Sequence, residues 1–203
     1  MMRRITGWLA ACMLACSVSA AAFAAADGTR LELPQGVDLA VVAFEDLQCP
    51  DCARAHPVLL EQTRTAGVPL IIRDFPITRH VWAFPAAVLA RYFSNLSPEL
   101  GVEFRSYVYE HQREITPANL REHGERFAAA QRLTLPGDVD PDGKLAALVQ
   151  ADYDLGIRIG LEYVPLMFVV ARGDGASRAV EVKDAGEVGP AVAKFRQGAQ
   201  PQR

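Results

Sequence analysis

Two cysteines, Cys49 and Cys52, are separated by only two residues. They lie between the apolar run Leu39–Phe44, which predicts a buried strand, and residues 53–65, which predict a helix. The unpaired N–H groups and partial positive charge of a helix N-terminus stabilise a thiolate, so the pKa of Cys49 should be lowered. Pro50 suits the first helical position, where its missing N–H would have no partner. Cys52 follows about one turn later, so the spacing predicts thiol–disulfide exchange.

Composition and charge exclude several other classes of function. The 203 residues are 50% hydrophobic and 22% charged, which is typical of a globular protein with one domain, or one domain that carries an insertion. A formal charge of −3 without a basic run gives no reason to expect nucleic-acid binding. The chain has no phosphate-binding loop and no dinucleotide-binding glycine motif, so we expect no cofactor.

Residues 1–26 are predicted to be a cleaved signal peptide. Two arginines, Arg3 and Arg4, precede a largely apolar stretch that ends in small residues suited to a signal peptidase. The apolar stretch is shorter than the ~20 residues that a membrane span needs. We therefore expect export to the periplasm or another extracytoplasmic compartment. Cys12 and Cys16 each follow residues of lipoprotein-signal type, so lipid anchoring at either one stays open.

Removal of this segment leaves Cys49 and Cys52 as the cysteines of the mature chain, residues 27–203. A disulfide framework would need more cysteines, spread along the sequence. The loop that one C-x-x-C pair closes is too small to add much stability. The pair is therefore expected to be functional rather than structural.

The first half of the mature chain predicts a parallel β-α-β unit. Residues 29–33 are expected to form a short edge strand, followed by a strand over 38–44. The helix after the cysteines should be kinked by Pro57. A second buried strand is expected over 68–75, and a strand–helix–strand order of this spacing is typical of parallel strands.

No strand is expected between residues 78 and 160. Apolar residues recur there at helical spacing, and helix-start signals stand at Ser97-Pro98-Glu99, Thr116-Pro117 and Asp140-Pro141. This stretch therefore predicts an inserted all-helical subdomain over about 78–160.

Strand character returns near the C-terminus. Residues 166–170 are expected to pair with 178–182 as a hairpin, followed by a closing helix over 184–196. The fold class is therefore α/β, with helices both within and after the sheet.

This order of elements, together with three motifs, resembles the DsbA-like branch of the thioredoxin superfamily. The motifs are Phe44–Cys52 with its C-P-x-C, Arg73–Ile77 followed by His80, and Gly160–Val169 with Val164-Pro165 before a strand. The resemblance covers about Val37 to Phe195. It implies a thioredoxin fold with a helical insertion.

The resemblance also implies roles for individual residues. Cys49 would be the exposed nucleophile that forms the mixed disulfide, and Cys52 would be the resolving cysteine. Pro165 would follow a cis peptide bond, which is uncommon and marks a specified geometry. The Val164 backbone would then face outward, where a substrate peptide could pair with it near Cys49.

The two residues between the cysteines, Pro50 and Asp51, are expected to tune the redox pair. A low-pKa thiolate is a good leaving group, so its disulfide is readily reduced and acts as an oxidant. A negative charge on Asp51 would oppose the helix terminus and raise the pKa of Cys49. We therefore expect a weaker oxidant than a relative with histidine at this position.

One position departs from the family pattern. Many relatives carry a buried acid six residues before the first cysteine, where this chain has Ala43. Glu45, Asp46 or His56 could substitute, and strand alternation places Glu45 on the same face as Ala43 if the strand extends that far.

Two histidines have an ordinary interpretation beside a functional one. His56 could join the cysteines in a zinc site, but a structural site needs four ligands, so a polar helix position is favoured and no metal is expected. His80 is expected to be a helix-start and core residue rather than an acid–base group.

The expected function is thiol:disulfide oxidation in other exported, cysteine-containing proteins. The resemblance implies re-oxidation by a membrane quinone-linked partner of the DsbB or vitamin K epoxide reductase type. A disulfide reductase or isomerase is the enzymatic alternative, which Asp51 keeps open. A non-catalytic metal-binding or chaperone module that uses Cys49, Cys52 and His56 is the alternative from another class.

Overall fold

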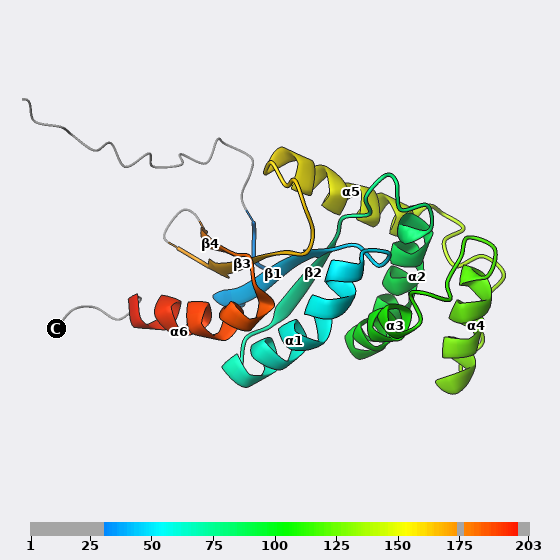
Figure 1. The fold of residues 1–203 in the computed structure, drawn as a ribbon, viewed down its shortest axis with the longest axis horizontal. Helices are drawn as coiled ribbons and strands as arrows, with labels where there is room; N and C mark the ends of the chain where they lie inside the picture. Colours follow the sequence, from blue (N-terminus) through cyan, green and yellow to red (C-terminus); the bar gives the residue numbers. More distant parts are fainter. Residues whose placement is uncertain (1–30, 174–176, 199–203) are drawn as a thin grey trace, which may run out of the picture.

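The fold is built on a four-stranded mixed sheet (Figure 1). The computed structural model describes residues 31–173 and 177–198, so the predicted signal peptide and its two cysteines lie outside the described residues. The strand order is β2-β1-β3-β4, in which β1 and β2 are parallel and the other two pairs are antiparallel. The strands are β1 (Leu39–Glu45), β2 (Leu70–Asp74), β3 (Leu166–Ala171) and β4 (Arg178–Val182). The predicted parallel unit and the C-terminal hairpin are thereby confirmed.

Six α-helices and one short 3₁₀ helix complete the described residues. They are α1 (Pro50–Ala66), α2 (Ala83–Leu96), α3 (Pro98–Glu110), α4 (Leu120–Ala130), α5 (Lys144–Arg158), η1 (Ala185–Glu187) and α6 (Val188–Gly198). Helices α2 to α5 fill the segment between β2 and β3, so the predicted all-helical insertion is confirmed. In the part of the chain that the structure describes, no helix has the length and apolar character required to cross a membrane.

Alternation along β1 places its side chains in two hydrophobic layers. Val41 and Ala43 face α1 and α6, in a cluster that includes Leu59 of α1. Val42 and Phe44 face the opposite layer, which contains residues of the helical insertion. Figure 1 shows α1 and α6 on one side of the sheet and α5 on the other. The carboxyl end of β1 therefore leads directly into the junction between the sheet, α1 and the insertion.

The predicted edge strand over residues 29–33 is wrong for its described part. Leu31 and Leu33 are buried in the core, which explains their strand-like alternation, but they belong to no strand of the sheet. Instead of strand hydrogen bonds, the Arg172 guanidinium donates hydrogen bonds to the carbonyl oxygens of Leu33 and of Pro34 and Val37, which follow the segment. Residues 29 and 30 lie outside the described residues.

Candidate active site

The two cysteines lie at the N-terminus of α1, as predicted. Cys49 is the N-cap residue and has extended backbone angles, and Pro50 is the first helical residue. The helix continues past Pro57 and ends at Gly67, whose φ of 60° is the left-handed conformation that favours glycine. Both cysteines are free thiols. Local sequence signals thus account for the whole turn that presents them.

A segment from the far end of the chain completes the site. The Cys49 thiol Sγ lies 3.7 Å from the carbonyl oxygen of Val164, and the Val164–Pro165 peptide bond is cis. The predicted exposure of Cys49 is wrong, because only 6% of the residue is accessible. Val164, whose backbone was expected to face outward, is also only 6% accessible. The Val164 backbone and the side chain of Gln112, which donates to the Cys49 carbonyl oxygen at 3.1 Å, contact it from two sides.

The environment of Cys49 favours its thiolate. A hydrogen bond from the Cys52 thiol is the largest influence and lowers the pKa of Cys49 to about 6, with help from the Cys52 backbone N–H. Burial and the charge of Asp46 oppose this shift, while His80 supports it. With a pKa of about 6, roughly nine in ten Cys49 side chains are ionised at pH 7. The first cysteine is therefore a ready nucleophile.

Cys52 has the opposite character. It is fully buried, and burial is the main reason that its pKa lies above that of an ordinary thiol. The hydrogen bond with Cys49 and the charge of Glu45 raise this pKa further. Opposing them, the backbone N–H of Asp46 donates to Cys52 Sγ at 3.4 Å. The second cysteine is therefore a thiol at neutral pH and needs a base before it can react.

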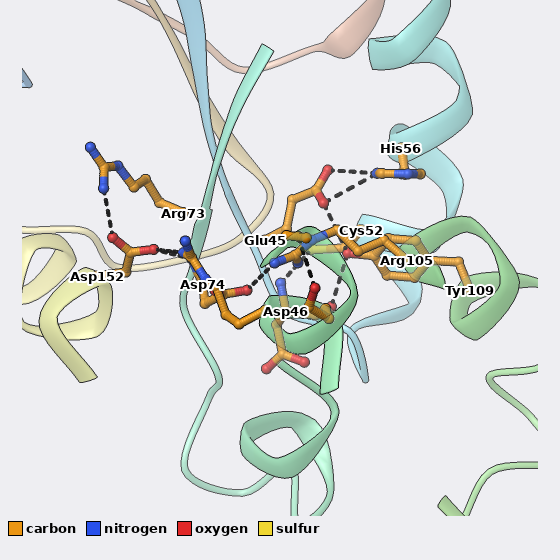
Figure 2. Close-up of polar contacts among 12 residues, drawn as sticks. Glu45, Asp46, Cys52, His56, Arg73, Asp74, Arg105, Tyr109 and Asp152 are labelled. Carbon is orange, nitrogen blue, oxygen red and sulfur yellow. Dashed lines mark hydrogen bonds and ion pairs between the residues drawn. The ribbon is translucent and has the colours of Figure 1, made fainter. Parts of the chain in front are cut away.

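Glu45 is a buried carboxylate close to the dithiol turn. Because β1 extends to Glu45, this residue shares a strand face with Ala43. Its oxygens lie 3.1 and 3.2 Å from His56 Nδ1, and the Tyr109 hydroxyl donates to it at 3.2 Å. Figure 2 shows these side chains together with Cys52. His56 is a polar residue of α1, as expected, but it is buried, and its Nδ1 contacts the Glu45 carboxylate.

Ion pairs between buried carboxylates and buried or partly buried arginines connect this site to the helical insertion (Figure 2). The pairs join strands and helices that lie far apart in sequence: Arg105–Asp74, Arg91–Asp74, Arg91–Asp152 and Arg73–Asp152. Burial acts to lower the pKa of Arg105, but the carboxylates of Asp74 and Glu45 outweigh it and raise that pKa. The ion pairs therefore hold α2, α3 and α5 against β2, beside the end of β1.

Asp46 and His80 form a second polar group beneath the dithiol turn. The Asp46 carboxylate lies 2.8 Å from His80 Nδ1. It also accepts hydrogen bonds from the backbone N–H groups of Gln48 and Ile77, each at 2.6 Å. The expectation that His80 is only a helix-start and core residue missed this contact. Both residues lie in motifs that carried the family resemblance, and Asp46 was also a candidate to replace the acid that is missing at Ala43.

Asp51 lies on the outer side of the turn. Its side chain is 61% exposed and pairs with Arg54, one turn further along α1. Water screens a charge in this position strongly. A tuning role for Asp51 stays a prediction, and any effect on Cys49 should be smaller than that of the buried Asp46.

A groove of about 500 Å³ runs from the dithiol turn along α1. Its walls come from α1, from the segment around the cis peptide bond and from the start of η1; they are formed by Asp51, Arg54, Ala55, Val58, Tyr163, Val164, Pro165, Lys183, Asp184 and Ala185. The groove therefore passes Val164 and Pro165, the residues predicted to bind a substrate peptide.

The side chains around the cysteines give little support for a metal site. Within residues 31–173 and 177–198, no group of three or more histidine, cysteine or acidic side chains is arranged to hold a metal ion. His56 bonds to Glu45 and, through Nε2, lies 3.3 Å from Ser106 Oγ.

Comparison with known proteins identifies the fold. The family described as Thioredoxin matches residues 38–174. The crystal structure of α-DsbA1 from Wolbachia pipientis superposes with a TM-score of 0.64 at 19% identity, covering 83% of this chain and 94% of that one. The catalytic domain of Proteus mirabilis ScsC gives 0.61 at 16% identity, covering 81% and 86%. Pseudomonas aeruginosa DsbA2 gives 0.59 at 14% identity, covering 82% and 92%. The predicted fold class and the likeness to DsbA-type oxidoreductases, which are enzymes, are confirmed.

A curated relative shares part of the sequence. It is the Na(+)/H(+) antiporter NhaA 3 of Salinispora tropica, which is 28% identical over 110 residues. The match covers 50% of this chain and 16% of the antiporter, so it concerns a small part of that protein.

Proposed function

Because the chain belongs to the thioredoxin family and has a DsbA-like fold, we propose that it is a thiol:disulfide oxidoreductase that acts through Cys49 and Cys52. The observation that carries this proposal is the contact of a low-pKa cysteine with a distant backbone carbonyl. Cys49, with a pKa of about 6, lies 3.7 Å from the Val164 carbonyl oxygen. A nucleophilic sulfur and a peptide-binding backbone thus share one site.

In the proposed reaction the oxidised pair accepts two electrons from a substrate dithiol. A substrate thiolate attacks Cys49 Sγ, the Cys49–Cys52 bond breaks, and Cys52 leaves as a thiolate that takes up a proton. A second substrate thiolate then attacks the substrate sulfur of the mixed disulfide. The substrate disulfide forms, and Cys49 leaves as a thiolate, which its low pKa stabilises.

Substrate is proposed to bind along the Val164–Pro165 segment and the adjoining groove. An extended peptide can pair with backbone groups of another segment without a fixed sequence, because main-chain hydrogen bonds supply the affinity. A substrate cysteine held against Val164 would approach Cys49 Sγ directly. Such a mode suits an enzyme that acts on cysteines in different proteins.

The Glu45–His56 pair is proposed to exchange the proton of Cys52. Cys52 is fully buried, so water cannot easily reach its sulfur. The charge of Glu45 raises the pKa of Cys52. His56 Nδ1 lies within hydrogen-bond distance of the Glu45 carboxylate. The pair therefore occupies the role left open by Ala43.

Oxidation is the proposed direction in vivo, with less driving force than in strongly oxidising relatives. The pKa of about 6 for Cys49 lies between the values of ~7 in thioredoxin and ~3.5 in DsbA. A less stabilised thiolate makes the disulfide a weaker oxidant. A reductase or isomerase is the second candidate, favoured by the buried negative charge of Asp46 near Cys49.

The proposed setting follows from the sequence. Residues 1–26 would direct export to the periplasm or another extracytoplasmic compartment, with lipid anchoring through Cys12 or Cys16 as an alternative to release. The substrates would be exported proteins that contain cysteines. A membrane quinone-linked protein of the DsbB or vitamin K epoxide reductase type would take up the two electrons and restore the disulfide.

Oxidative refolding tests this function. Mature protein, with Cys49–Cys52 oxidised, is mixed with a reduced, unfolded substrate such as ribonuclease, and recovery of substrate activity is followed. We expect the substrate to gain disulfides as the protein loses its own, one for one. No acceleration over air oxidation, together with rapid reduction of insulin disulfides, would instead support the reductase.

A further inference from the structure

The buried carboxylate of Asp46 is fixed to the dithiol turn by several bonds. Its side chain is fully buried and accepts hydrogen bonds from the backbone N–H groups of Gln48 and Ile77. Its backbone carbonyl accepts from the Cys49 N–H at 3.0 Å, and its own N–H donates to Cys52 Sγ at 3.4 Å. Asp46 therefore cannot move without moving both cysteines.

A negative charge held in this position works against the thiolate of Cys49. Like charges in a buried site disfavour each other, because little water is present to screen them. The donors to Asp46 from Gln48 and Ile77 are neutral, so they stabilise the carboxylate without cancelling its charge. His80 is the partner of Asp46 that can carry a positive charge, with Nδ1 at 2.8 Å.

We propose that His80 is a positioning residue which, in its protonated form, offsets the buried charge of Asp46 and so sets the stability of the Cys49 thiolate. His80 acts through Asp46 rather than on the substrate. It begins the segment before α2, where its carbonyl accepts from Ala83 and its N–H donates to Ile77. The helical insertion thereby contributes one residue to the redox centre.

His80 also has a route to solvent. Its side chain is 15% exposed and lines a groove of about 300 Å³ between the loop after β2 and α5. The groove is otherwise formed by Pro76, Ile77, Thr78, Val81, Phe84, Gln150 and Tyr153. The titratable groups that face His80 are Asp46 from the β1–α1 turn, Tyr153 from α5 and the Cys49 thiol. His80 therefore joins the buried carboxylate of Asp46 to a groove that is open to solvent.

His80→Asn tests this inference, since the asparagine amide can replace Nδ1 as a donor to Asp46 but carries no charge. The Cys49 pKa is measured on reduced protein by thiolate absorbance and by the pH dependence of iodoacetamide alkylation. We expect the pKa of Cys49 to rise by about half a unit, which makes alkylation at pH 6 roughly twofold slower. His111→Asn is the matched control, because His111 Nδ1 bonds to the Tyr107 carbonyl oxygen on α3; this variant should match the unchanged protein.

The inference is overturned if His80→Asn folds and leaves the Cys49 pKa unchanged, or if His111→Asn shifts it equally. If His80→Asn does not fold, Asp46→Asn decides: removal of the opposing charge should lower the pKa of Cys49, and an unchanged or raised pKa overturns the inference. The effect of His80 on the rate of disulfide exchange rests on the proposed function, whereas its effect on the Cys49 thiolate does not. Alkylation needs no protein substrate, so failure of the exchange function would be recognised separately, in the refolding assay.

Discussion

Cys49→Ser is expected to lose all acceleration of oxidative refolding. Serine cannot form the mixed disulfide, and removal of a nucleophile costs about as much as removal of the whole catalytic unit. The fold should persist, because the hydroxyl replaces a small thiol at the N-cap, where serine is a preferred residue. The measurement is the initial rate of substrate recovery, which should equal that of the buffer alone.

Cys52→Ser is the matched control for this variant. It keeps the Cys49 nucleophile but removes the resolving thiol, so reaction with a disulfide-containing substrate should stop at the mixed disulfide. Mass spectrometry should then find substrate attached to Cys49, and none attached in Cys49→Ser. Capture of substrate through Cys52 in the Cys49→Ser protein would reverse the proposed roles.

Glu45→Gln is expected to slow the resolving step at neutral pH by about ten- to a hundredfold. A positioned general base contributes typically ~10²–10⁴-fold, and the amide cannot accept the Cys52 proton. Loss of the Glu45 charge also lowers the pKa of Cys52, but this charge ranks below burial and the Cys49 hydrogen bond among the causes that raise it. The defect should shrink as the pH rises, because hydroxide then removes the proton.

The resolving step is measured by stopped flow, as conversion of a glutathione mixed disulfide at Cys49 into the Cys49–Cys52 disulfide. Glu61→Gln is the control, since this exposed residue of α1 pairs with its neighbours Arg64 and Thr65, on the outer face of the helix. A neutral-pH rate for Glu45→Gln equal to that of the control would show that another group takes the proton.

The local part of the site could be predicted because its signals are local. Cys49 and Pro50 lie where a helix begins, and the stop at Gly67 follows from glycine's left-handed conformation. The pairing with Val164 could not come from such signals, because 115 residues separate it from Cys49. It was accessible only through the family resemblance, which the shared fold now supports.

The sequence could not reveal which polar side chains are buried together. His56 follows Cys52 by one turn and looks like an ordinary polar helix residue until β1 places Glu45 against it. Asp46 and His80 meet because β2 runs parallel to β1 and delivers the loop after it to the dithiol turn. Strand pairing, rather than residue type, thus decides which charges act on Cys49. For the same reason, the sequence pattern gave Asp51 a larger part in tuning Cys49 than its exposed position supports.

The reduction potential of the Cys49–Cys52 pair tests the central claim most directly. Purified mature protein is equilibrated with defined ratios of reduced and oxidised glutathione, and the fraction of disulfide is measured after acid quenching. A Cys49 pKa of about 6 predicts a potential between those of thioredoxin, ~−270 mV, and DsbA, ~−120 mV. A value at or below that of thioredoxin would contradict an oxidase and assign the protein to disulfide reduction.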